Sequence, residues 1–424
     1  MKSARELKNI RGKRVLVRVD FNVPLAKSSV HSSQFTVEDD TRINAAIPTI
    51  EFLLKKGAKV VLMSHFGRPG KIKNVKLKMK NDLEPIVDRL SELLKKKAGG
   101  VEKWDFTLIY ERIKKMKAGG ILMLPNLRLH PGEEKNSAAF ARDLAGLGQI
   151  YVNEAFSVCH RKHASVVGVP KFLPSYAGLQ LMKEVEVLSR VLHKPEKPLL
   201  ALMGGGKIAD KIALMRAMVK RANAVLVGGA LATHFFKAMG YGVGDSRIEA
   251  EGVQLAKKLV GNHRHGGASK KIVLPRDVVV GRDDGEGARV VEVLAKSQEQ
   301  RAKSSTPYAL CSKPDAVLDI GPQTILEYAK HIKGARTLIW NGPMGLYEIK
   351  RYSHGTLALG RLFAARSRGR AFGVAGGGET IDALNQTGML EYVDFVSTGG
   401  GAMLEFLGGR KLPGIEALHN TEKH

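Results

Sequence analysis

The stretch PLLALMGGGKIADKIALMRAMVKRANAVLVGGALATHF, residues 198–235, decides the fold. It opens with an apolar run, Leu199–Met203, that turns at three glycines into a pattern of helical period over residues 211–222. A second apolar run, Ala224–Val227, ends at another glycine pair before a further helical segment. Runs that are apolar throughout are typical of strands covered on both faces, and a helix between two of them predicts a parallel β-α-β unit.

The same alternation extends along the chain. Apolar runs predict further strands at residues 14–19, 59–63, 120–124, 149–152, 271–274, 337–340 and 371–374, and amphipathic patterns predict helices at residues 45–56, 82–97, 137–147 and 252–260. This alternation predicts the α/β class, with two doubly wound parallel-sheet (Rossmann-like) domains. Residues 288–307 are instead expected to form an exposed helix and loop.

A domain boundary is expected within KEVEVLSRVLHKPEKP, residues 183–198. A helical pattern there is broken by Pro195 and Pro198 just before a new strand begins. The chain then divides into an N-terminal domain of residues 1–182, an interdomain helix or hinge of residues 183–198, and a second domain that begins at residue 199. A length of 424 residues agrees with two domains.

The chain carries a high positive charge. Lys and Arg number 68 against 41 for Asp and Glu, which gives a net charge of +27. Such a surface attracts polyanions, which include nucleic acid, anionic membranes and phosphorylated metabolites. The basic residues are dispersed and aromatic residues make up only 6%, so a dedicated nucleic-acid partner is not expected. The sequence has no apolar run of transmembrane length, and its two cysteines favour a reducing compartment.

Four glycine-rich turns in the second half each lead toward a helical pattern. The first holds Gly204, Gly205 and Gly206, and Lys207 and Lys211 place two ammonium groups nearby. The others are VGGALATHF, VAGGGETID and STGGGAMLEF. Turns beyond the carboxyl ends of parallel strands bind phosphates at helix N-termini. Each turn could serve tight packing alone, but four together favour a phosphorylated or dinucleotide ligand.

The first half presents an arginine or a histidine after each of several predicted elements. Arg18, Asp20 and Asn22 alternate at the end of one strand and therefore share a face. The other candidates are Arg42, His65, Arg68, Arg128, His130, His160, Arg161 and His163. Converging guanidinium groups suit a small ligand with several anionic groups. The alternative is that each arginine pairs with a nearby acid, and the histidines lack the further ligands of a metal site.

These motifs carry a resemblance to a known family. They are VRVDFNVPL, DDTRINAAIPTIEFLLKKGAKVVLMSHFGRP, NLRLHPGEE, HRKHAS, GGGKIADKI, WNGPMGLYE and VSTGGGAMLEFLGGRKLPG. In this order, from about Arg14 to Leu418, the chain resembles phosphoglycerate kinases. The resemblance implies two doubly wound domains joined by a helical hinge. Residues 1–182 would bind 3-phosphoglycerate or 1,3-bisphosphoglycerate, residues 199–400 would bind nucleotide, and residues 401–424 would return to the N-terminal domain.

The resemblance also implies the reaction. A phosphoryl group would pass reversibly from 1,3-bisphosphoglycerate to MgADP, giving ATP and 3-phosphoglycerate, so that the chain would be a phosphotransferase with a carboxyl group as acceptor. The implied partners are these small molecules and Mg²⁺, with no membrane and no dedicated nucleic acid. The implied state is a monomer in the cytoplasm, with a peroxisome-like organelle as the alternative.

The site residues carry over by motif. The implied catalytic residues are Arg42, Lys207, Lys211, Gly377 and Gly378. The implied triose-binding residues are Asp20, Phe21, Asn22, Arg42, His65, Phe66, Gly67, Arg68, Arg128 and Arg161. The implied nucleotide-binding residues are Gly205, Gly206, Lys207, Lys211, Gly228, Gly229, Val317, Asn341, Pro343, Glu348, Gly376, Gly377, Gly378, Glu379 and Thr380, with Glu379 as the metal ligand.

Several positions depart from the family's usual residues. Glu379 replaces an aspartate beside the Mg-nucleotide, and Val317 replaces a glycine against the adenine. Glu154 replaces another aspartate, Pro125 replaces an acidic residue, and Ser157, Val158 and Cys159 replace the usual Gly-Thr-Ala set. These changes leave open a second interpretation, a catalytically weak or inactive paralogue with a ligand-binding or regulatory role.

Overall fold

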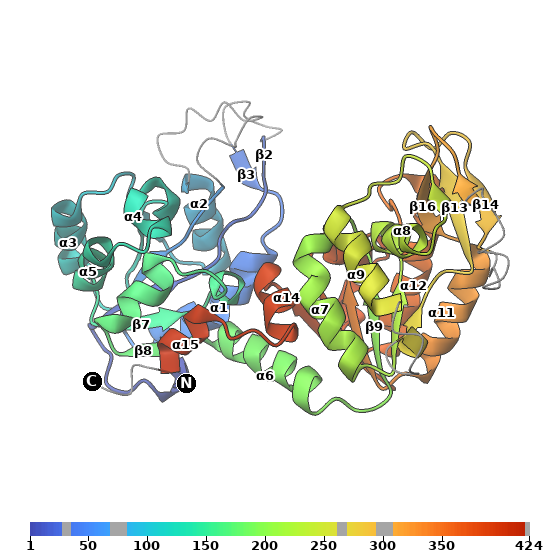
Figure 1. Ribbon diagram of the computed structural model, residues 1–424. Helices are drawn as coiled ribbons and strands as arrows, with labels where there is room; N and C mark the ends of the chain where they lie inside the picture. Colours follow the sequence, from blue (N-terminus) through green and yellow to red (C-terminus); the bar gives the residue numbers. More distant parts are fainter. Residues whose placement is uncertain (28–34, 68–82, 261–268, 294–307, 420–424) are drawn as a thin grey trace. The chain divides into compact units, whose positions relative to one another are not determined.

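The computed structural model describes residues 1–27, 35–67, 83–260, 269–293 and 308–419 (Figure 1). The chain forms two compact units. Unit 1 comprises Met1–Glu186 and Lys411–His424, and unit 2 comprises Val187–Arg410. Helix α6 (Leu179–His193) runs through the point where the chain leaves unit 1. Among the described residues, no helix combines the length and the apolarity needed to cross a bilayer.

Unit 1 contains a six-stranded parallel sheet in the order β5-β6-β4-β1-β7-β8. Its strands are β1 (Arg14–Arg18), β4 (Lys59–Met63), β5 (Gly99–Gly100), β6 (Ile121–Met123), β7 (Ile150–Asn153) and β8 (Ser175–Ala177). Its α-helices besides α6 are α1 (Thr41–Lys55), α2 (Glu84–Leu93), α3 (Phe106–Lys115), α4 (Pro131–Glu134), α5 (Ala138–Gly146) and α15 (Pro413–His419). Strands β2 (Leu25–Lys27) and β3 (Phe35–Val37) pair separately. Strand order reverses between β1 and β7, so the carboxyl ends there flank a topological switch point.

Helix α1 shows why these segments fold as they do. Its buried apolar residues Ile43, Ala46, Ile50 and Leu53 recur at three- and four-residue spacing, so they form one stripe along the helix. The stripe belongs to a core shared with Val15, Val17, Val60 and Leu62 of the central strands. Packing of this stripe on the sheet therefore fixes where the start of α1 lies.

Unit 2 contains a second six-stranded parallel sheet, in the order β12-β10-β9-β17-β18-β19. Its strands are β9 (Leu199–Met203), β10 (Ala224–Val227), β12 (Ile272–Val273), β17 (Thr337–Asn341), β18 (Phe372–Gly376) and β19 (Phe395–Ser397). Its α-helices are α7 (Ile208–Arg221), α8 (Gly229–Ala238), α9 (Ala250–Val260), α11 (Pro322–Gly334), α12 (His354–Arg366), α13 (Gly378–Gln386) and α14 (Gly401–Leu407). The order reverses between β9 and β17, which again creates a switch point. The predicted class, two doubly wound parallel sheets, is confirmed.

Unit 2 also contains smaller sheets that the sequence pattern did not indicate. Strands β14 (Arg289–Glu292), β13 (Asp277–Gly281) and β16 (Ala316–Ile320) form an antiparallel sheet, and β11 (Gly242–Val243) pairs with β15 (Ala309–Cys311). The expected helix within residues 288–307 is wrong at β14, whose Val290 pairs with Val279 of β13. A short apolar run such as RVVEV satisfies a strand pattern as well as a helical one. Residues 294–307 lie outside the described part of the chain.

Candidate active site

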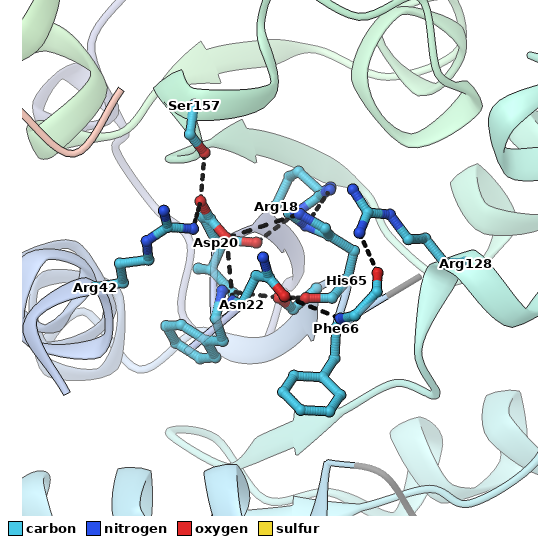
Figure 2. Close-up of polar contacts among 12 residues, drawn as sticks. Arg18, Asp20, Asn22, Arg42, His65, Phe66, Arg128 and Ser157 are labelled. Atoms are coloured by element: carbon cyan, nitrogen blue, oxygen red, sulfur yellow. Dashed lines mark hydrogen bonds and ion pairs between the residues drawn. The ribbon is translucent and has the colours of Figure 1, made fainter. Parts of the chain in front are cut away.

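Polar side chains gather at the switch point of unit 1 (Figure 2). Asp20 follows β1, His65 follows β4, and Ser157 follows β7, while Arg42 is the second residue of α1. Because β4, β1 and β7 are neighbouring parallel strands, their carboxyl ends bring these side chains to one edge of the sheet. Figure 2 shows Arg42, Ser157 and Asn22 arranged around Asp20.

Asp20 is the centre of this cluster. Its Oδ2 accepts a hydrogen bond from Arg42 Nη1 at 2.8 Å and another from Ser157 Oγ at 2.5 Å, while Oδ1 accepts the Asn22 backbone N–H at 3.1 Å. Burial opposes ionisation, but the neighbouring positive charge and these hydrogen bonds outweigh it and lower the pKa of Asp20. Asp20 is therefore a fixed carboxylate, and it holds Arg42, whose side chain is 36% exposed, at the edge of the site.

His65 is held as a neutral ring. Arg18, only 1% exposed, lies 3.1 Å through Nη2 from His65 Nδ1. A guanidinium can only donate, so Nδ1 accepts and the ring proton lies on Nε2, which is 3.9 Å from Asp20 Oδ1. Burial, followed by the charge of Arg18, lowers the pKa of His65 well below its usual value. His65 therefore presents an uncharged N–H donor to the site at neutral pH.

Two amide side chains lock the loops around His65. Asn22 Oδ1 accepts the backbone N–H of Gly67 at 2.9 Å, and Asn126 donates to Phe66 O at 2.8 Å and accepts its N–H at 3.1 Å. Arg128 Nη1 donates to the carbonyl of Gly67, which adopts a φ of +59° that favours glycine. The loop after β4 is thus fixed by residues from two other segments.

The remaining triose-binding candidates lie in different surroundings. Phe21 is fully buried, and its backbone N–H donates to Ser64 Oγ. Phe66 packs against the core of unit 1. Arg161 donates through Nε to His160 Nε2 at 3.3 Å. Arg68 lies outside the described residues.

Glycine turns of unit 2 converge at its switch point. The turns after β9, β10 and β17 pack so closely that a Cβ on Gly204, Gly229 or Gly342 would collide with the backbone of a neighbouring turn. Gly205 has a φ of +76°, and a Cβ there would lie 2.7 Å from Lys211 Nζ and 3.1 Å from Glu379 Oε2. Only glycine permits this approach, so the turns bring Lys211 and Glu379 to the same point.

A cavity of about 590 Å³ opens beside these turns. Its wall includes seven of the residues expected to bind nucleotide, namely Gly205, Gly206, Gly229, Val317, Pro343, Glu348 and Glu379. Val317 is nearly buried in this wall, and its backbone N–H donates to Ser246 Oγ at 2.9 Å. A cavity of ligand size therefore remains with valine at this position.

Other residues expected to bind nucleotide connect the strand ends and helix starts next to the cavity. Asn341 Nδ2 donates to Gly376 O at 2.7 Å, and Thr380 Oγ1 accepts the Gly342 N–H at 2.7 Å, which ties the end of β17 to the start of α13. Gly377, with a φ of +98°, is the N-cap of α13, and Gly378 is the first residue of that helix. Lys207 is the N-cap of α7, and Gly228 is the N-cap of α8. Three helices thus begin around the glycine turns.

Lys211 is a buried cation in this group. Its Nζ donates to Gly204 O, and burial lowers its pKa to about 8, although the charge of Glu379 acts in the opposite direction. The ammonium is still protonated at pH 7 and is poorly hydrated. Such a group binds an incoming anion strongly.

The donor set also fits a magnesium ion carried by a nucleotide. Mg²⁺ in such sites commonly takes one or two protein carboxylates and completes its shell with phosphate and water oxygens. Glu379 supplies one carboxylate in the cavity wall. Among the described residues no cluster of three or more His, Cys, Asp or Glu side chains could hold a metal by itself.

No sequence pattern predicted a role in the sites for several residues that the structure brings into them. Ser157 and Asn126 contact the unit 1 cluster, and Ser246 and Arg247 lie in the cavity wall of unit 2. Ser157, Ser246 and Arg247 belong to no glycine turn or strand-end arginine motif, whereas Asn126 begins the NLRLHPGEE motif that supplies Arg128. The alternation along the strand predicted that Arg18 shares a face with Asp20, but no sequence pattern indicated that Arg18 contacts His65.

The two doubly wound parallel sheets, each with a candidate site at its switch point, define an α/β protein of the kind that binds ligands at strand carboxyl ends. A family model described as Phosphoglycerate kinase matches residues 5–410. The chain belongs to the phosphoglycerate kinase family, and it is accordingly a phosphotransferase. The phosphoglycerate kinase of Moorella thermoacetica is 42% identical over 420 residues, and that of Chloroflexus aggregans is 42% identical over 416 residues. These alignments cover 98% and 97% of both chains, respectively.

Solved structures agree with this assignment. Phosphoglycerate kinase from Coxiella burnetii matches with a TM-score of 0.80 and 34% identity, and that from Pyrococcus horikoshii with a TM-score of 0.82 and 29% identity. Each match covers 99% of both chains. None of these comparisons favours an inactive paralogue.

Proposed function

We propose that the Asp20 cluster of unit 1 binds 3-phosphoglycerate or 1,3-bisphosphoglycerate and that the cavity of unit 2 binds MgADP or MgATP. The observation that carries this proposal is the pairing of Lys211 and Glu379 around Gly205, at the edge of a cavity of nucleotide size. Lys211 suits a phosphate, and Glu379 suits the metal that accompanies it. A hydroxylated, anionic triose would meet a hydrogen-bond acceptor in Asp20, a neutral hydrogen-bond donor in His65 and a cation in Arg42.

These residues position the substrates and neutralise the negative charge of the transferred phosphoryl group. Phosphoryl transfer needs little covalent help from a protein, since its transition state spreads charge over the equatorial oxygens. Arg42 and Lys211 supply cations, and the N-terminus of α13, at Gly377 and Gly378, supplies backbone N–H groups. Glu379 would hold the Mg²⁺ of a bound nucleotide, which would neutralise phosphate charge.

Transfer requires the two substrates to meet. We propose residues 183–198, which include most of α6, as the hinge, and closure as the step that excludes water from the acyl phosphate. We also propose a cytoplasmic monomer, with a peroxisome-like organelle as the alternative location. Both cysteines are free and buried, and burial raises the pKa of Cys159 to about 12 and that of Cys311 to about 11, so neither thiol is readily oxidised.

The direct test is turnover. Purified protein is given ATP, Mg²⁺ and 3-phosphoglycerate, and the 1,3-bisphosphoglycerate that forms is measured by coupled NADH oxidation. Turnover that falls at least a hundredfold in Arg42→Ala is expected, because this variant loses a cation at the reacting group. A folded wild-type protein without turnover would contradict the proposal and leave a ligand-binding paralogue.

A further inference from the structure

Arg247 lies in the cavity wall of unit 2, between β11 and α9. Its Nη1 is 4.0 Å from the point where a Cβ on Gly206 would lie. Apart from atoms of Gly206 and its two chain neighbours, no other heavy atom of the described residues lies as close to that point. The open side of Gly206 therefore faces a guanidinium group. Gly206 belongs to the turn that leads from β9 into α7, a helix of 14 residues.

A chain of contacts sets the position of Arg247. Its Nη2 lies 3.5 Å from Glu249 Oε1, and the backbone N–H of Glu249 donates to His234 Nε2 at 2.8 Å. His234 Nδ1 lies 2.6 Å from the carbonyl of Ala230 on α8, so Nδ1 carries the ring proton and Nε2 accepts. Burial lowers the pKa of His234, which keeps the ring in this neutral form. The loop that carries Arg247 is thus anchored to α8.

An ordinary surface ion pair does not account for this geometry. The Arg247 side chain is 69% exposed, and an exposed pair at 3.5 Å contributes little stability. The pair uses Nη2, whereas Nη1 is the atom that lies 4.0 Å from the position of a Cβ on Gly206. A guanidinium can bind an anion with one nitrogen while another holds a carboxylate, because its donors form a planar fork.

Two lysines lie near this position, on the turn and helix that carry Gly206. Lys207, at the N-cap of α7, and Lys211, one turn later, belong to the same turn and helix as Gly206. The N-terminus of α7 adds backbone N–H groups and the positive end of the helix dipole. The fitting ligand group is a phosphate oxygen, the anion that a nucleoside diphosphate brings to such a turn.

We propose that Arg247 is a further nucleotide-binding residue, which donates to a phosphate oxygen of the nucleoside diphosphate beside Gly206. This inference rests on the proposed nucleotide site of unit 2 and adds a cation that no family motif assigned. Arg247 acts on the phosphate chain and not on the base, so its contribution requires a phosphorylated ligand.

The test is calorimetric binding of MgADP and of adenosine to wild type, Arg247→Ala and Arg247→Lys. Arg221→Ala is the matched control, because Arg221 is an exposed arginine on the last turn of α7 and its loss removes the same charge from the same unit. Loss of a charge-assisted hydrogen bond predicts an MgADP Kd about tenfold higher in Arg247→Ala, with a smaller increase in Arg247→Lys. Adenosine affinity and the Arg221→Ala values should equal those of wild type.

The outcomes separate the two proposals. Equal MgADP affinity in wild type and Arg247→Ala, with both proteins showing the same thermal unfolding, overturns the role of Arg247 alone. Equal losses for MgADP and adenosine also overturn it, because the side chain would then act on the shape of the cavity. Wild-type protein that binds neither ligand overturns the nucleotide site itself. Glu249→Gln provides a milder variant, in which weaker positioning of Arg247 should raise the MgADP Kd about twofold to threefold.

Discussion

Asp20 Oδ2 accepts two side-chain hydrogen bonds, and the donors differ in kind. Arg42 is a partly exposed cation that can move toward a ligand, whereas Ser157 is a short side chain held close to the strand end by its own backbone. The serine therefore fixes the carboxylate even when the arginine leaves it. Positions of this type set how well a site is organised before its ligand arrives.

Replacement of Ser157 tests this positioning. Ser157→Ala removes the hydroxyl and should weaken 3-phosphoglycerate binding about fivefold, since one hydrogen bond of roughly 1 kcal/mol is lost. Binding of MgADP should not change. Titration calorimetry with each ligand gives both values, and Ser157→Thr, which keeps the hydroxyl, is the control. Unchanged 3-phosphoglycerate affinity in Ser157→Ala would show that Asp20 is fixed without the serine.

Lys211 predicts a pH dependence. Its pKa of about 8 means that the ammonium loses its proton between pH 7 and pH 9, within the range where an ordinary lysine stays charged. A phosphate binds the protonated form, so the Kd for MgADP should rise about tenfold from pH 7 to pH 9. Calorimetry across this range measures the effect. Lys211→Arg does not titrate there and should give a flat profile; a flat wild-type profile would mean that another cation dominates binding.

The sequence predicted those side chains whose positions follow from the sheet. Asp20 and His65 end neighbouring strands, and Lys211 follows a glycine turn, so sheet topology alone brings them to the switch points. Ser157 contacts Asp20 across 137 residues, and Arg247 reaches Gly206 from a loop without a motif. Contacts of this kind depend on loop paths that no periodicity encodes, which is why the sequence did not indicate them.

Among the elements, the central strands were the most predictable. β1, β4, β9 and β17 are buried on both faces and therefore appear as uninterrupted apolar runs. The antiparallel strands β13, β14 and β16 were not predicted, and of these β14 is largely exposed. Strand pairing is decided by partners distant in sequence, so an exposed run gives a weaker signal than a buried one.

Helix α6 begins at a buried acid. Glu154 accepts the backbone N–H groups of Gln180 and Leu181, and Thr49 Oγ1 donates to the same carboxyl at 2.5 Å. Thr49 in turn accepts the N–H of Leu179. Thr49 of α1 and Glu154, the residue that follows β7, therefore fix the first turn of the helix that leads out of unit 1.

Glu154 predicts how stability changes with pH. Burial raises its pKa to about 8, so between about pH 4.3 and 8 the folded chain keeps a proton that the unfolded chain releases. Stability from this group is complete below that window and is lost as the pH rises through it. Glu154→Gln removes the titration, so its unfolding temperature should fall less between pH 5 and pH 8 than that of wild type, by several degrees. Differential scanning calorimetry measures this difference.

The control for this experiment keeps the carboxyl group. Glu154→Asp should retain a pH-dependent unfolding temperature, although its shorter side chain weakens the contacts with Gln180 and Leu181. Identical pH profiles for wild type and Glu154→Gln would show that Glu154 does not titrate in this range.

The net positive charge of the chain predicts that added salt lowers kcat/KM for an anionic substrate. A net charge of +27 attracts substrates that carry several negative charges, and salt screens this attraction over distances of about 10 Å at 0.1 M. The kcat/KM for 3-phosphoglycerate should fall roughly threefold to tenfold between 20 and 300 mM KCl, because encounter is slowed. The kcat at saturating substrate should change much less. Equal losses in both parameters would indicate inhibition by salt at the site, not loss of attraction.

Unit 1 is assembled from two separate stretches of chain. Its second stretch begins at Lys411, and there Gly414 N–H donates to Cys159 O at 2.8 Å, while the amino group of Met1 lies 3.3 Å from His419 Nδ1. All of unit 2 lies between the two stretches in sequence. During synthesis, unit 2 can therefore complete its fold before unit 1, although unit 1 begins first. Unit 1 can complete its packing only after the residues from Lys411 onward are translated, and a stop codon after Arg410 would leave it without helix α15.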